Sequence, residues 1–177
     1  MRWVLLATLV LAACKEDVAD LPAPVAITAE SAGFYCQMSL LEHDGPKGQV
    51  HLDGMPAPLF FSQVRDAVAY LHMPEQSHAV RVTYVQDMTG ATWAEPGPWI
   101  RAEAALYVIG SDRVGGMGGA ELVPFASAEA AGDFAAQHGG RVRSFVEIRA
   151  ADVLEASERP ASEHDDMGAR LSRLSGG

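Results

Sequence analysis

The sequence predicts an α+β fold built from two similar β-β-α-β units in one compact domain. A short motif occurs twice, 65 residues apart, so that Phe60 and Ser62 match Phe125 and Ser127. Each copy leads into a stretch whose apolar residues recur at helical spacing, and each serine is suited to cap that helix. Strand-like stretches lie before and after each helix. The simplest interpretation is duplication of one ancestral unit.

The first unit is expected within residues 25–90. A strand is predicted at 49–52, and a helix at 63–71, which Pro74 ends. Residues 80–85 alternate between apolar and polar side chains, which predicts the strand that follows the helix.

The second unit is expected within residues 105–156. It repeats the order with a strand at 105–109 and a helix at 128–137, which two glycines terminate. A last strand is predicted at 142–148. One face of that strand is expected to carry three apolar residues, Val142, Val146 and Ile148.

The remaining segments are rich in turn-forming or polar residues. Residues 91–104 are expected to form a connecting loop, and packing explains its Trp93 and Trp99 more simply than ligand binding does. Residues 157–177 are polar with little periodicity, which predicts a disordered tail. The acidic stretch at 163–167 includes a His and a Met, but it is interpreted as part of this solvated tail.

The N-terminus has the pattern of a bacterial lipoprotein signal peptide. Residues 1–13 begin with the basic Arg2, continue with an apolar stretch and end in Leu-Ala-Ala before Cys14. Cys14 is therefore expected to be lipidated, and residues 14–24 to form a tether to the membrane. Lys15, rather than an aspartate, follows the cysteine, which favours the outer membrane over the inner one.

The composition disfavours several classes of function. A formal net charge of −10 and an isoelectric point near 4.9 argue against nucleic-acid binding. The chain has no P-loop sequence. The glycine-rich stretch at 115–121 is not a dinucleotide-binding loop, because Glu121 stands where the third glycine is required and no helix follows at once.

A lone thiol and nearby thioethers predict a site for a soft metal ion. With Cys14 lipidated, Cys36 has no partner for a disulfide, and Met38 follows it by two residues. In an extended segment these two side chains would project to the same face. Thiolate and thioether donors select Cu(I), whereas the six scattered histidines lack the spacing of a zinc site. Met117, between two pairs of glycines, is interpreted as a third soft donor.

These motifs together resemble the NosL family of copper-binding lipoproteins, which are accessory to nitrous oxide reductase. The resemblance extends from about Cys36 to Val153 and includes the Cys-Gln-Met sequence at 36–38 and the Gly-Met-Gly sequence at 116–118. It implies a fold similar to part of the organomercurial lyases. It also implies a periplasmic Cu(I) carrier that works with the ABC-type transporter complex NosDFY to build the copper sites of nitrous oxide reductase.

The resemblance further implies that Cys36 and Met38 are Cu(I) ligands. Met117 is the preferred third ligand, because it lies in the Gly-Met-Gly sequence. Met55 and Met73 each precede a proline and are interpreted as packing or turn residues. Three competitors for the site remain: Met88, Asp87 and His43.

Two other classes of function compete with the copper carrier. A thiol-dependent enzyme related to organomercurial lyase would need a second cysteine in the mature chain, or a histidine base at a recognisable spacing, and the sequence offers neither. A metal-independent assembly lipoprotein would leave the lone thiol and its methionines unexplained. We therefore expect a Cu(I) chaperone that is not an enzyme.

Overall fold

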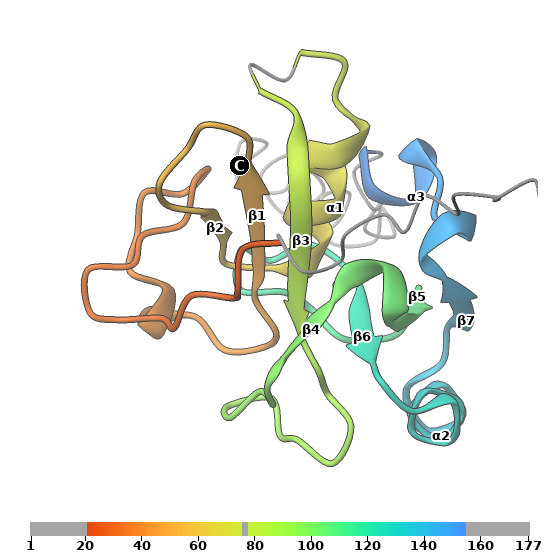
Figure 1. Cartoon of the computed structure of the whole chain (residues 1–177). Helices are drawn as coiled ribbons and strands as arrows, with labels where there is room; N and C mark the ends of the chain where they lie inside the picture. The colour runs from red at the N-terminus through yellow and green to blue at the C-terminus, as the bar shows by residue number, and fades with distance from the viewer. Residues whose placement is uncertain (1–20, 76–77, 155–177) are drawn as a thin grey trace, which may run out of the picture.

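A computed structural model describes residues 21–75 and 78–154 of the chain (Figure 1). The predicted signal peptide, the lipidation site at Cys14 and the predicted tail at 157–177 lie outside these ranges. Among the helices that the structure describes, none has both the length and the apolar character needed to span a bilayer.

The first unit forms a four-stranded antiparallel sheet with one helix. Its elements are β1 (Gly48–Leu52), β2 (Leu59–Phe61), α1 (Val64–His72), β3 (Val80–Gln86) and β4 (Trp99–Arg101). The strand order is β2-β1-β3-β4, and α1 packs against the first three of these strands (Figure 1). The predicted β-β-α-β unit is confirmed, and β4 extends its sheet.

The second unit repeats this arrangement with three strands. Its elements are β5 (Leu106–Ile109), β6 (Val123–Phe125), α2 (Ala128–His138) and β7 (Arg141–Ser144). The order β6-β5-β7 places the first strand in the centre, as β1 lies between β2 and β3. The α+β fold with two similar units is therefore confirmed.

The two units are equivalent at a spacing one residue shorter than predicted. Phe61 and Phe125 hold the same position, because each pairs with the first residue of its central strand. The helix N-caps are Gln63 and Ser127, so both pairs lie 64 residues apart. Ser127 accepts a hydrogen bond in α2 and confirms its predicted role, whereas the prediction for Ser62 was wrong because the helix starts one residue later.

The last predicted strand ends early, at Ser144, and the chain continues as the short 3-10 helix η4 (Phe145–Glu147). The Glu147 carboxylate accepts hydrogen bonds from the N–H and the hydroxyl of Ser144, which closes this turn. Val146 is 88% exposed whereas Ile148 is buried. The prediction that they share one face was wrong, because the helical turn replaces the alternation of a strand.

The predicted connecting loop, 91–104, contains β4 and the 3-10 helix η3 (Ala102–Ala104) as well as turns. Trp93 packs against a core cluster of the second unit, and its carbonyl accepts a hydrogen bond from the N–H of Gly45 at 2.7 Å. The guanidinium of Arg113 lies 5.6 Å from the centre of the Trp93 ring. The packing interpretation of Trp93 is therefore confirmed.

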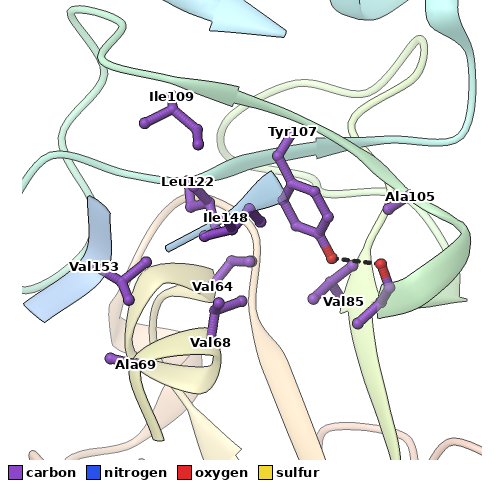
Figure 2. Close-up of a cluster of buried hydrophobic side chains, with 11 residues drawn as sticks. Val64, Val68, Ala69, Val85, Ala105, Tyr107, Ile109, Leu122, Ile148 and Val153 are labelled. Carbon is purple, nitrogen blue, oxygen red and sulfur yellow. Dashed lines mark hydrogen bonds between the residues drawn. The ribbon is translucent and has the colours of Figure 1, made fainter. Parts of the chain in front are cut away.

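The largest core cluster joins the two units (Figure 2). Val64 and Val68 of α1 face Tyr107 of β5, whose hydroxyl donates a hydrogen bond to the Ala102 carbonyl at 2.8 Å. The short helix α3 (Ala150–Leu154) adds a buried valine. Both units supply this core. The N-terminal half of α1 is therefore packed against the second unit.

Candidate metal site

Residues 32–39 form a closed loop rather than an extended segment. The N–H of Gly33 donates to the carbonyl of Met38 at 2.9 Å, and the N–H of Gln37 donates to the carbonyl of Gly33 at 2.8 Å. Gln37 has a φ of 56°, in the left-handed region that non-glycine residues rarely adopt. The extended geometry expected for Cys36 and Met38 was therefore wrong, because the chain turns between them.

The thiol of Cys36 is half-buried and is not in a disulfide. Its Sγ lies 3.8 Å from the hydroxyl of Ser62. It also lies on the backbone of Gly33, where an added Cβ would come within 2.5 Å of the sulfur. Gly33 and Ser62 thus support the thiol on one side, and Met38 of the same loop is 44% exposed.

Residues 114–120 form a small hairpin that carries Met117 at its tip. The N–H of Gly115 donates to the carbonyl of Gly119 at 2.8 Å, and the N–H of Gly118 donates back to the carbonyl of Gly115 at 2.9 Å. Gly118 has a φ of 83°, which a residue with a Cβ adopts poorly. Met117 is 47% exposed, as its glycine neighbours predicted.

Both sulfur-bearing loops contact the N-terminal end of α1. The backbone N–H of Met117 donates to Oε1 of Gln63 at 3.3 Å, and the adjacent Ser62 contacts the thiol of Cys36. The structure therefore brings the three predicted ligands to neighbouring loops around one dipeptide. Their assignment as ligands stays a prediction.

Two of the three competing residues have other roles. Met88 is 6% exposed and belongs to the core cluster beneath α2. The Oδ1 atom of Asp87 accepts hydrogen bonds from the N–H groups of Thr89, at 2.9 Å, and Ala126, at 2.8 Å. Met88 thus fills the core, and Asp87 ties the first unit to the chain before α2.

His43 is the competitor that lies at the site. It packs against Gly116 of the Met117 hairpin, where an added Cβ would come within 2.7 Å of the histidine Cβ. Its Nε2 atom is buried without a hydrogen-bond partner. Across residues 21–75 and 78–154, no group of three or more His, Cys, Asp or Glu side chains could hold a metal ion. Methionine sulfur is the soft donor that could complete a site around Cys36 or His43 in this part of the chain.

Met55 and Met73 fit their predicted roles in turns. Met73 is the C-cap of α1, and its sulfur accepts a hydrogen bond from the hydroxyl of Tyr35 at 3.4 Å. The N–H of Met55 donates to the carbonyl of Leu52 in the turn after β1.

A buried polar group that the sequence did not predict lies beneath the Met117 hairpin. Oε1 of Glu121 accepts hydrogen bonds from the N–H groups of Arg65, at 3.0 Å, and Leu122, at 2.8 Å. A residue of the second unit thus caps the first turn of α1. The one available signal was Gln63, which is not among the residues that usually cap a helix with their own side chain.

Burial shifts the ionisation of this polar group. Burial raises the pKa of Glu121 to about 8, although the N–H groups of Arg65 and Leu122 and the ammonium group of Lys47 oppose the shift. Burial also lowers the pKa of Lys47, and the carboxylates of Glu121 and Asp44 oppose that change. Desolvation is the largest effect in both residues, so each charged form is less favoured here than it is in water.

Glu121→Gln is expected to reduce the pH dependence of stability. From about pH 5 to 8 the unfolded chain has released the Glu121 proton, given its usual pKa of 4.5, while the folded protein retains it. Stability therefore falls as pH rises through this window, by up to about 1 kcal/mol per unit from this group. Urea denaturation at several pH values measures the slope. The surface variant Glu95→Gln should keep the wild-type slope, and equal slopes in all three proteins would contradict the assignment.

The fold and the site together define a class of protein. A small α+β protein whose thiol and thioether loops contact one helix end is a candidate soft-metal binding protein. The model of the NosL family matches residues 24–153. This chain belongs to the NosL family.

Three relatives in this family are similar to the chain in sequence or in structure. The chain is 50% identical over 183 residues to the copper-binding lipoprotein NosL of Achromobacter cycloclastes, covering 98% of this chain and 95% of that protein. It is 35% identical to the copper-binding lipoprotein NosL of Stutzerimonas stutzeri, covering 81% and 75% of the two chains. The crystal structure of the copper chaperone NosL from Shewanella denitrificans matches with a TM-score of 0.69 and 33% identity, covering 73% of this chain and 97% of that one.

Proposed function

We propose that the protein is a lipid-anchored Cu(I) chaperone that delivers copper for assembly of the copper sites of nitrous oxide reductase. The observation that carries the proposal is that the Cys36 loop and the Met117 hairpin contact adjacent residues, Ser62 and Gln63, at the start of α1. Relatives named copper-binding lipoprotein and copper chaperone support the choice of metal.

The exposure of the donors suits a carrier that must also release its metal. Cys36 would supply the anionic soft ligand, and Met38 and Met117 would supply neutral ones. Both methionines are nearly half exposed, so a donor from a partner can approach the metal from their side. Copper would then pass to the partner by stepwise ligand exchange, with Met117 leaving first because its hairpin is rich in glycine.

The proposed partners and location follow from the family resemblance. The ABC-type transporter complex NosDFY would receive the copper, and nitrous oxide reductase would obtain it directly or through that complex. Lipid on Cys14 would hold the protein on the periplasmic side, and Lys15 favours the outer membrane.

The test of this function is metal selectivity. The chain lacking residues 1–14 should bind one Cu(I) under reducing, anaerobic conditions and discriminate strongly against Zn(II) and Ca(II), because its donors are soft. Competition with chelators of known affinity measures this. Zinc bound as tightly as Cu(I) would remove the chaperone proposal, and failure to bind any copper would favour a metal-independent assembly lipoprotein.

A further inference from the structure

We propose that Gln63 is a positioning residue that sets the place of Met117 relative to Cys36 without touching the metal itself. This inference rests on the proposed function, since it concerns how the copper site is held together. Gln63 is 5% exposed and lies between the two loops, directly after the serine that contacts the Cys36 thiol. None of the expected ligands adjoins it in the sequence.

The side chain of Gln63 is available for this role because another residue caps the helix. Gln63 occupies the N-cap position of α1, but its side chain does not accept a hydrogen bond from a backbone N–H of the first turn. The N–H of Arg65, which an N-cap side chain would normally satisfy, donates instead to Glu121. Only the first unit uses a distant residue as the cap, because Ser127, the equivalent residue of α2, caps its own helix.

The amide oxygen of Gln63 contacts the Met117 hairpin. Oε1 accepts the hydrogen bond from the N–H of Met117 and lies against Gly115, where any side chain would collide with it. An amide oxygen that is buried against Gly115 and accepts from the N–H of Met117 limits where the backbone of Met117 can lie.

The same dipeptide supports both loops. The Ser62 hydroxyl lies 3.8 Å from the sulfur of Cys36, and the next residue holds the Met117 hairpin. The N-terminal end of α1 thus contacts two segments that are about 80 residues apart in the sequence. Releasing the hairpin from Gln63 should let Met117 move away from the Cys36 loop.

A double-mutant cycle tests this role. Cu(I) affinity is measured by anaerobic chelator competition for the wild type, Gln63→Leu, Met117→Leu and the double variant. Loss of one neutral hydrogen bond should weaken binding roughly three- to tenfold in Gln63→Leu. In the Met117→Leu background the same change should have almost no effect, because the ligand that it places is already gone. X-ray absorption of the Gln63→Leu complex should show one fewer sulfur neighbour of copper.

The controls separate positioning from general destabilisation. Ser127→Ala removes the equivalent N-cap of α2 and should lower the melting temperature without changing Cu(I) affinity. Gln63→Asn keeps the amide but shortens it, so it should reproduce the loss of affinity and provides the test if the leucine variant does not fold. Two results would overturn the positioning role alone. One is that Gln63→Leu lowers Cu(I) affinity by the same factor with Met117 present and with Met117→Leu. The other is that neither Gln63 variant changes the affinity. A wild type that binds no Cu(I) would remove the proposed function and this role together.

Discussion

Cys36→Ser is expected to lower Cu(I) affinity by orders of magnitude while the fold stays intact. The substitution removes the only anionic soft donor among the three proposed ligands, and a serine hydroxyl is a poor ligand for a soft ion. The structure offers the new hydroxyl a polar neighbour, because Sγ already lies 3.8 Å from Ser62 Oγ. Half-burial further limits the cost of the change. Chelator competition measures the affinity, and thermal unfolding of the metal-free protein measures the stability.

Met88→Leu is the matched control for the loss of a sulfur atom. Met88 fills the core cluster beneath α2, so its replacement should leave Cu(I) affinity unchanged. A methionine-to-leucine exchange in a core costs less than about 1.5 kcal/mol. The ligand assignment of Cys36 fails if Cys36→Ser strongly lowers the melting temperature but leaves copper binding unchanged.

Gly48→Ala is expected to destabilise the protein by about 1–3 kcal/mol through overpacking. Gly48 is buried in β1, between β2 and β3, at the place where α1 crosses the sheet. A methyl group there would collide with the methyl group of Ala67 on α1. Neither group has a rotatable side chain with which to avoid the other, so the helix or the strand has to shift. Urea denaturation measures the change in the free energy of unfolding.

Gly132→Ala is the control with the opposite expected sign. Gly132 lies within α2, and an added Cβ would meet nothing within 4 Å. The substitution should stabilise the protein by about 0.5–1 kcal/mol, because alanine loses less backbone freedom in a helix than glycine does. A neutral effect of Gly48→Ala would show that α1 is packed more loosely on β1 than the structure indicates.

The architecture was predictable because it depends on local periodicity. The alternation along residues 80–85 correctly predicted β3, and the helical spacing along residues 128–137 correctly predicted α2. Ser127 was also predictable as a cap, since its hydroxyl bonds to the helix that immediately follows it. These features involve neighbours in the chain, and a single sequence contains that information.

The predictions that were wrong concern features that depend on contacts between distant segments. The cap of α1 comes from Glu121, 56 residues beyond Arg65, and no local pattern around Ser62 reveals it. The turn at Cys36 depends on a left-handed Gln37, a conformation that the residue type does not suggest. Met88 carries the same side chain as Met117, and only the tertiary structure shows that one is buried and the other exposed.

The cap that Glu121 supplies to α1 has a consequence for how the protein folds. Arg65 is tied to the second unit twice, since its N–H donates to Glu121 and its Nε donates to the carbonyl of Val153 at 3.0 Å. The helix of the first unit therefore lacks its partners until the second unit is in place. A fragment that ends before β5 would leave the start of α1 frayed, even though the repeat gives it every strand and helix of its own. Amide hydrogen exchange within α1 should then report the opening of the whole molecule, so that the two halves of a duplicated chain behave as one cooperative unit.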